Sequence, residues 1–307
     1  MAYLRAFGAY LPTRVVDNAE LAAQTGAGAE WIVRSTGIEQ RRFAAGHESV
    51  ASLGVAAAQD CLENAGMSPR EVGMLLVACS SAPCRFPGPA SSIGTDLGIP
   101  GVPAIDLPIA SAGSLFGMAL AAHLVPAYRN VLVIGTEIMS RVATEGDTAF
   151  LFGDGAGACL VSAESGFAEI RDALLSSDAE FADALRLDLA APLYMEGRTI
   201  IMQASRKVPR AITELLHRNR IPPLDVQVFL MHQANLNLIA RVAQTVGVPQ
   251  ERFSCNIQRF GNTSSASLLI AAAEWRSQDP SPLAGPAVFA AFGAGLHWGA
   301  LLAVPKE

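Results

Sequence analysis

The sequence predicts an α/β protein whose helices cover its sheets, and three observations support this. Apolar, β-branched runs bounded by turn residues recur along the chain, with helical stretches between them. The 307 residues are 51% hydrophobic, which is enough for one large core or two joined cores. The second half of the chain faintly repeats the plan of the first, so we expect duplication of a domain of roughly 150 residues.

Four strands and five helices are the elements that the pattern marks most clearly. The strands are short apolar runs at 72–78, 131–134, 226–231 and 288–292. The helical stretches lie at 50–65, 111–125, 206–218, 236–246 and 264–275. Alternation of this kind is typical of sheets that are covered by helices.

A Ser/Gly-containing break at 163–167 divides the chain into two halves of similar plan. In each half a buried strand is followed by a turn of small residues, an apolar helix and one more strand. We therefore expect an N-terminal half at 1–164 and a C-terminal half at 165–307.

Charge and cysteine content narrow the classes of function. A net charge of −6 argues against nucleic acid as the main partner, because such binders need a basic surface. No signal peptide is visible, and no stretch reaches the roughly 20 apolar residues of a membrane-spanning helix. The five cysteines form no C-x-x-C pair, which indicates reduced thiols and not a disulfide framework or a zinc site. We expect a soluble, cytoplasmic protein without a metal.

The segment 106–116, DLPIASAGSLF, places one hydroxyl among small residues where a strand gives way to a helix. Small neighbours let a substrate approach, and a helix N-terminus supplies free N–H groups and partial positive charge. This setting suits Ser111 as a nucleophile. An ordinary helix cap is the other interpretation, and the segment taken alone favours it.

Two polar residues of the second half are further candidates. His232 ends the apolar strand VQVFLM, where polar groups of α/β proteins often face the ligand crevice. Asn262, in FGNTSSAS, carries an amide that can donate to an enolate or thioester oxygen. A core histidine with satisfied hydrogen bonds and a helix N-cap remain the alternatives for these two residues.

A glycine loop, FGAGLHWG, completes the set of candidate segments. Its glycines free the backbone to turn N–H groups inward around Ala294, which could complete an oxyanion hole. Together the segments supply a nucleophile, a histidine, an asparagine and a glycine loop, spread over both halves. Cys84, beside Arg85, is a rival nucleophile outside these segments.

With these segments in view, the chain resembles β-ketoacyl-acyl-carrier-protein synthase III along essentially its whole length. The similar segments are EWIVRSTGI at 30–38, FGDGAGA at 152–158, HQANL at 232–236, GNTS at 261–264 and AFGAGLHWG at 291–299. The resemblance implies a duplicated thiolase fold with five layers, αβαβα, and a homodimer. It also implies an acyltransferase that needs no cofactor, with acyl-CoA as substrate and acyl carrier protein as a possible partner.

The resemblance also implies roles for individual residues. The catalytic set would be Ser111, His232 and Asn262, with the N–H groups of Ser111 and Ala294 forming the oxyanion hole. Trp31 would stack on the adenine of coenzyme A, and Phe86 would help to wall the acyl pocket near the dimer interface. The full set of expected substrate contacts is Trp31, Phe86, Asn235, Arg198, Gly293 and Gly295.

Ser111 stands where the family keeps a cysteine, and this is the most important departure. A serine hydroxyl is far less acidic than a thiol, so it needs His232 as an explicit general base. The oxyester that it forms is also a poorer acyl donor than a thioester. Three interpretations stay open: a natural serine variant, a serine introduced in place of cysteine, or a site without covalent chemistry.

A second departure concerns the basic residues that hold coenzyme A and the carrier protein. Asn237 and Gly146 stand where the family usually has arginine. Basic residues that could compensate are Arg198, Arg206, Lys207 and Arg210, although a solvated helix face explains them equally well. Acyl transfer without condensation, and a non-catalytic partner subunit, are therefore alternatives to the condensing enzyme.

Overall fold

The computed structural model of the protein describes residues 1–145, 148–188 and 191–306. Within these ranges, ten strands join in one sheet in the order β12-β11-β13-β14-β8-β1-β7-β6-β4-β5. The first half of the chain supplies β1 (Tyr3–Tyr10), β4 (Met74–Ala78), β5 (Ala104–Leu107), β6 (Asn130–Ile138) and β7 (Asp154–Ser162). The second half supplies β8 (Ala168–Ser177), β11 (Val228–Met231), β12 (Phe253–Ser254), β13 (Ala287–Gly293) and β14 (His297–Pro305).

The sheet consists of two half-sheets with the same topology. In each half the strands, numbered along the chain, lie in the order third, second, fourth, fifth and first. The two half-sheets pair where Tyr3 and Leu4 of β1 lie opposite Glu169 and Ala168 of β8. The repeated order supports duplication. The boundary between 164 and 165 falls in the connection from β7 to β8 and stays a prediction.

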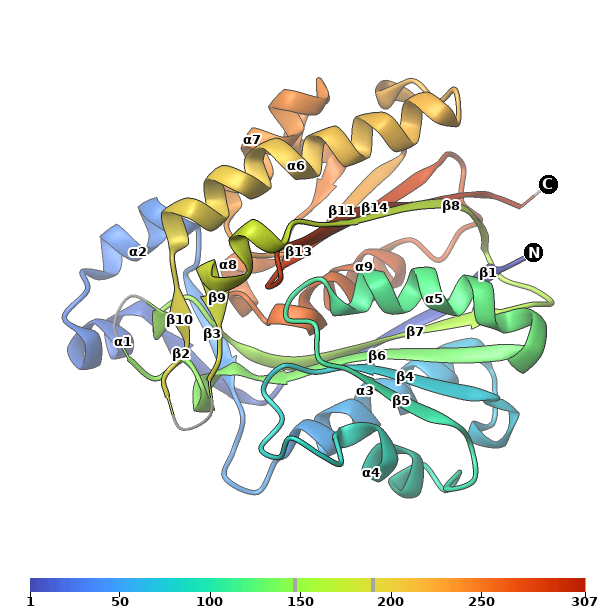
Figure 1. Cartoon of the computed structure of the whole chain (residues 1–307), viewed down its shortest axis with the longest axis horizontal. Helices are drawn as coiled ribbons and strands as arrows, with labels where there is room; N and C mark the ends of the chain where they lie inside the picture. The colour runs from blue at the N-terminus through green and yellow to red at the C-terminus, as the bar shows by residue number, and fades with distance from the viewer. Residues whose placement is uncertain (146–147, 189–190, 307) are drawn as a thin grey trace.

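Helices cover both half-sheets and fill the space between them, as Figure 1 shows. The central pair is α5 (Gly113–Tyr128) and α9 (Ser267–Gln278). The outer layers are α3 (Val50–Ala65) with α4 (Pro89–Asp96), and α6 (Gly197–Arg218) with α7 (Leu236–Val246). Three large apolar clusters lie between successive layers. The five-layer αβαβα arrangement is therefore present.

The central helices need small residues on the strands that they touch. A Cβ at Gly135 of β6 would lie 2.4 Å from both the Ser114 hydroxyl of α5 and the Ser265 carbonyl oxygen. Strands β4 and β6 are buried along nearly their whole length, so most of their residues are apolar and these do not alternate with polar ones. This close packing brings the start of α5 against the second half of the chain.

Smaller elements surround these layers. They are the helices α1 (Asn18–Thr25), α2 (Ala29–Thr36) and α8 (Ile257–Phe260), and two antiparallel strand pairs, β2 (Arg14–Asp17) with β3 (Gln40–Phe43) and β9 (Leu185–Arg186) with β10 (Tyr194–Met195). Single 3-10 turns lie at Pro69–Glu71, Met139–Arg141, Pro223–Asp225, Gln250–Arg252 and Ser264–Ala266, and a longer one at Ala179–Ala184.

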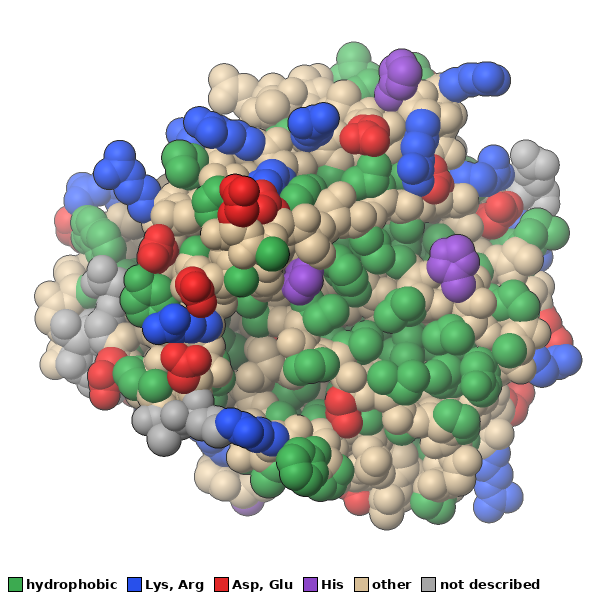
Figure 2. Space-filling view, viewed as in Figure 1, with side chains coloured by type: hydrophobic (Ala, Val, Ile, Leu, Met, Phe, Trp, Pro, Cys, Tyr) green, Lys and Arg blue, Asp and Glu red, His purple; other side chains and the backbone are tan. Residues whose placement is uncertain are grey.

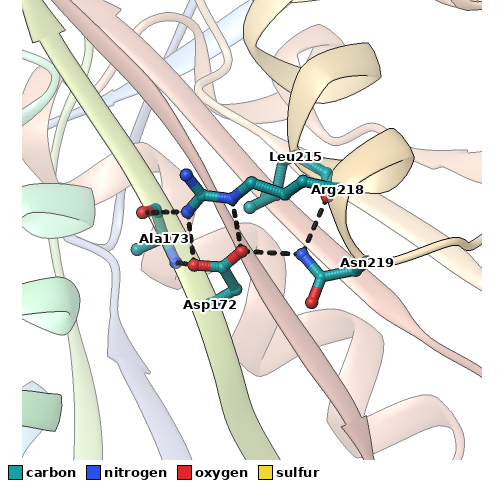
Figure 3. A network of polar contacts seen from close by, with 5 residues as sticks. All are labelled: Asp172, Ala173, Leu215, Arg218 and Asn219. Atoms are coloured by element: carbon teal, nitrogen blue, oxygen red, sulfur yellow. Dashed lines mark hydrogen bonds and ion pairs between the residues drawn. The ribbon is translucent and has the colours of Figure 1, made fainter.

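A polar network joins the end of α6 to β8. Figure 3 shows Arg218 and Asn219 converging on the Asp172 carboxylate, to which both donate hydrogen bonds. Arg218 also donates to the carbonyl oxygen of Ala173. The network fixes where α6 ends on the second half-sheet.

The predicted helices agree with the structure where local signals mark their ends. The ranges 50–65 and 236–246 match α3 and α7, whose N-caps are Ser49 and Asn235. The helix predicted from Ser111 begins instead at Gly113, because Ser111 has a φ of 63° that no α-helix contains. The range 206–218 is also too short, since α6 begins at Gly197. Across the described ranges, no helix is both long and apolar enough to cross a membrane.

Candidate active site

Ser111 lies in a tight turn between β5 and α5. Its φ of 63° puts a residue with a Cβ in the left-handed region, a strained state that proteins mostly keep at functional positions. Its backbone N–H donates to the hydroxyl oxygens of Ser264 and Ser265, at 3.1 Å each. The second half of the chain therefore holds the Ser111 turn in place. The Ser111 N–H is engaged by these serines, so its place in an oxyanion hole stays a prediction.

Ser264 connects Ser111 to Asn262. The Ser264 N–H donates to Asn262 Oδ1 at 2.9 Å, and the Ser264 hydroxyl lies 3.4 Å from that of Ser111. The Asn262 backbone is anchored as well, because its N–H donates to the Leu151 carbonyl and its carbonyl accepts from Gly153. Among the residues that the structure describes, none bonds to Asn262 Nδ2, so this amide stays free to donate.

His232 follows the last residue of β11 and is 1% exposed. Its backbone N–H donates to the carbonyl oxygen of Ala290 on β13. The ring nitrogen Nδ1 lies 2.5 Å from the hydroxyl oxygen of Ser267. Burial lowers the pKa of His232 to about 3, so the ring is neutral at physiological pH. The ring also packs edge-on against Phe292, with centroids 5.3 Å apart.

One cavity brings four of the ten predicted site residues together. Ser111, Asn262, Ala294 and Asn235 all line it. The rest of its wall is mainly apolar, including Met139, Leu151, Phe152, Leu193, Met195, Ile200, Leu238 and Phe292. His232 is not part of the lining itself, but it touches Phe292, which is. The cavity thus contains groups from both halves of the chain.

The glycine loop packs directly on the Ser111 turn. A Cβ at Gly293 would lie 1.8 Å from the Ala110 carbonyl oxygen, so only glycine fits there. Gly295 has a φ of 128°, which other residues rarely adopt, and a Cβ there would meet the His297 ring. These contacts place Ala294 at the cavity beside Ser111. Whether its N–H binds an oxyanion stays a prediction.

Trp31 and Arg198 are both exposed on the surface. Trp31, on α2, is 43% exposed and packs edge-on against Phe150, leaving part of its ring open for stacking. Arg198 is exposed at the start of α6, next to Gly197 in the cavity wall, and within the described ranges it forms no ion pair. Both side chains are open to solvent, and their contacts with coenzyme A stay predictions. Gly146 lies outside the described residues.

Asn235 and Asn237 hold α7 against α2. Asn235 Oδ1 accepts from the N–H groups of Asn237 and Leu238, and its Nδ2 donates to the Ser35 carbonyl at 2.9 Å. Asn237 Nδ2 donates to the carbonyls of Arg34 and Ser35, at 3.1 Å each. The polar atoms of Asn235 are thus already engaged, although its side chain borders the cavity, and its substrate contact stays a prediction.

Phe86 lies apart from the Ser111 cavity. It is 84% exposed and borders an adjoining open groove, which shares Ser80, Ala110 and Ala294 with the cavity. Cys84 borders the same groove and not the cavity. Phe86 does not line the cavity of Ser111, and its expected role in an acyl pocket near a dimer interface stays a prediction.

Sequence reasoning missed the residues that support the catalytic candidates. The Ser111 turn is held by Ser264 and Ser265, and the His232 ring contacts Ser267. The polar run TSSAS in the sequence was the signal that could have indicated these serines. Glu137 is fully buried and accepts hydrogen bonds from Ser80 and Ser81; its signal was a carboxylate in the apolar strand VLVIGTEI. In the described part of the chain, no three His, Cys, Asp or Glu side chains group to hold a metal ion.

Comparisons with known proteins identify the fold and the family. The chain matches the 3-oxoacyl-[acyl-carrier-protein] synthase III family over residues 105–179 and the C-terminal family of the same enzyme over residues 216–304. A β-ketoacyl-[acyl-carrier-protein] synthase III of Oleidesulfovibrio alaskensis is 36% identical, with 98% of each chain covered.

Solved structures agree. The 3-oxoacyl-[acyl-carrier-protein] synthase III of Aquifex aeolicus superposes with a TM-score of 0.95 at 31% identity, covering 99% of this chain and 100% of that chain. The priming β-ketosynthase of the R1128 polyketide pathway superposes with a TM-score of 0.91 at 31% identity, covering 100% and 97%. The fold and these relatives place the chain among the transferases of the thiolase fold. Within that class, the chain belongs to the β-ketoacyl-acyl-carrier-protein synthase III family.

Proposed function

We propose that the chain is a condensing enzyme that takes an acyl group from acyl-CoA onto Ser111 and joins it to a malonyl-carrier thioester. The pathway would be fatty acid or specialised-metabolite synthesis. The observation that carries the proposal is the single cavity lined by Ser111 and Asn262, which come from opposite halves of the chain. The names of the relatives support the same activity.

The reaction has two stages. In the first, Ser111 Oγ attacks the thioester carbonyl, the carbon–sulfur bond breaks, and coenzyme A leaves with the serine proton. In the second, the malonyl group loses carbon dioxide, and the enolate carbon displaces Ser111, which regains a proton from solvent. A covalent intermediate splits one difficult step into two easier ones. Uncharged N–H donors such as Asn262 Nδ2 stabilise the enolate oxygen.

Exposed and buried side chains also bear on the acyl donor and on the cellular compartment. Trp31 and Arg198 offer a half-exposed ring and a cation for the adenine and phosphates of coenzyme A. Side chains and backbone N–H groups serve every step above, so we propose no cofactor. The free thiols, three of them buried, suit the reducing cytoplasm.

We further propose a homodimer. Phe116, Leu120 and Leu124 recur every four residues and so share one face of α5. Leu120 is 41% exposed, and Figure 2 shows hydrophobic side chains gathered over α5. An apolar helix face of this kind is typical of an interface. A second copy placed here would lie near β5, an edge strand beside the open groove that contains Phe86.

The test supplies the protein with acyl-CoA species of several lengths and then with malonyl-carrier protein. We expect an acyl adduct on Ser111 by intact-protein mass spectrometry, and carbon dioxide with a β-ketoacyl product in the second stage. Ser111→Ala should lose the adduct. An adduct without carbon dioxide would favour plain acyl transfer. Absence of any adduct on the native chain, with an adduct on Ser111→Cys, would contradict a serine nucleophile.

A further inference from the structure

Ser267 lies between a backbone N–H, which can only donate, and a histidine ring nitrogen whose role depends on the tautomer. Its hydroxyl oxygen is 3.2 Å from the backbone N–H of Gln233 and 2.5 Å from Nδ1 of His232. A backbone N–H can only donate, so the Ser267 oxygen accepts on that side. Ser267 Oγ and His232 Nδ1 share one further hydrogen bond, and the remaining question is which of these two atoms carries its proton.

The surroundings of Gln233 fix the direction of its N–H. The Gln233 side chain donates to the carbonyls of Met231 and Ser254, and its Oε1 accepts from the Asn256 N–H. Both ends of the side chain are thus held, and the residue is 1% exposed. These contacts anchor Gln233 where its backbone N–H donates to the Ser267 oxygen.

The Ser267 hydroxyl can donate its proton to one described acceptor. In the part of the chain that the structure describes, His232 Nδ1 is the only acceptor within hydrogen-bond distance of the Ser267 hydroxyl. If His232 Nδ1 carried the proton instead, the Ser267 O–H would be left unpaired in a site that is 1% exposed. A buried unpaired donor reduces the population of such a state on the order of tenfold or more.

We propose that Ser267 is a positioning residue, which holds His232 as the tautomer with its proton on Nε2. Nε2 lies on the ring edge away from Nδ1, and no described residue bonds to it. His232 then presents an N–H donor, as Asn262 does with its free amide. The neutral ring agrees with the lowered pKa of His232.

This assignment deepens the proposed function and, for its catalytic consequence, rests on it. A donor at Nε2 stabilises the negative oxygen of the enolate formed when malonyl thioester loses carbon dioxide. The same nitrogen has no lone pair to take the Ser111 proton. The resting site is thus set for decarboxylation, and His232 becomes a base for Ser111 only after the tautomer changes.

The direct test is an NMR measurement of the histidine ring nitrogens in protein labelled with 15N-histidine. The His232 signals are assigned by their loss in His232→Gln. We expect the shift of a protonated nitrogen at Nε2 and that of an unprotonated nitrogen at Nδ1 in the native chain. The reverse pattern would overturn the proposal. The measurement does not depend on enzymatic activity.

Three variants sharpen the test. Ser267→Ala removes the proton donor to Nδ1, so the share of the Nε2–H tautomer should fall. Ser267→Thr keeps a hydroxyl and should restore the native pattern. Ser277→Ala, at the exposed end of the same helix, should leave it unchanged. An unchanged tautomer in a folded Ser267→Ala protein would overturn the role of Ser267; if that variant does not fold, the native spectrum and Ser267→Thr decide.

The activity measurement separates this proposal from the function on which it rests. With malonyl-CoA as probe, Ser267→Ala should release carbon dioxide on the order of tenfold more slowly than Ser277→Ala. Equal rates would overturn the catalytic consequence. If the native chain releases no carbon dioxide but shows the Nε2–H tautomer, the proposed function fails and the role of Ser267 in setting the tautomer stands.

Discussion

His232 owes its chemical state to burial. The ring is 1% exposed and no carboxylate pairs with it in the described structure, so nothing offsets the loss of hydration of the charged form. Ser111 owes its state to the backbone, because a left-handed turn held by Ser264 and Ser265 presents its hydroxyl to the cavity. At this scale, long-range contacts and not the residue types set the chemistry.

The low pKa of His232 predicts a pH-dependent stability. An unfolded histidine titrates near 6.5, so the unfolded state binds more protons between that pH and the folded pKa of about 3. The stabilisation is present above pH 6.5 and is lost as the pH falls towards 3. We expect the free energy of unfolding, from urea titrations, to fall by about 2 kcal/mol between pH 8 and pH 5 through His232 alone.

Substitution isolates this contribution. In His232→Gln the free energy of unfolding should fall by about 2 kcal/mol less between pH 8 and pH 5 than in the native chain, since no histidine is left there to protonate. His47→Gln, which removes an exposed histidine, should keep the native slope. Parallel curves for the native chain and His232→Gln would show that the histidine is not buried in neutral form.

At the scale of the element, α6 depends on its connection to β8. The helix forms the outer layer over the second half-sheet, and its first turns contribute Gly197, Ile200 and Ile201 to the cavity wall. Its far end is held by Asp172 through Arg218 and Asn219 (Figure 3). Burial would raise the pKa of Asp172, but these hydrogen bonds hold it below its usual value.

Removing this charge tests the connection. Asp172→Asn should lower the free energy of unfolding by about 1 kcal/mol, because the ion pair is partly exposed. Amide hydrogen exchange should accelerate in the last turn of α6. Glu164→Gln, which breaks a more exposed pair with Arg129, is the matched control and should change little. Equal effects of the two substitutions would mean that the Asp172 network adds no stability of its own.

At the scale of the molecule, the chain leaves apolar surface uncovered on one face. Helix α5 is apolar all round, as expected of a helix that is buried on every side. Two half-sheets and α9 cover most of it, yet Leu120 is 41% exposed and Phe116 and Leu124 on the same face are partly exposed. Figure 2 shows hydrophobic side chains gathered over α5. The open groove that contains Phe86 adjoins the Ser111 cavity, so the proposed dimer would form close to the site.

A charge on this face should prevent self-association. Leu120→Glu would bury a carboxylate against apolar groups of the second copy, so we expect analytical ultracentrifugation to show a dimer for the native chain and a monomer for the variant. Leu224→Glu is the control, because Leu224 is 60% exposed in a different part of the chain, the 3-10 turn Pro223–Asp225. A native monomer, or a Leu120→Glu dimer, would contradict the proposed interface.

Local signals allowed much of the fold to be predicted. Helices α3 and α7 begin after a capping side chain and end at glycines 66 and 247 in left-handed conformation, so their ends were readable. Helix α6 was predicted too short, because its first two turns face the cavity and not a regular core. The segments HQAN, GNTS and FGAG pointed to the site, since each combines polar or small residues with the end of an apolar element.

The sequence by itself determined the fold class, the family resemblance and the residue types available for chemistry, because these depend on periodicity and short motifs. Tertiary structure alone decided that Ser111 is held by serines more than 150 residues away, that Ser267 faces His232, and that His232 is neutral. Hydrogen-bond partners and desolvation arise only when distant segments pack, so no local pattern contains them.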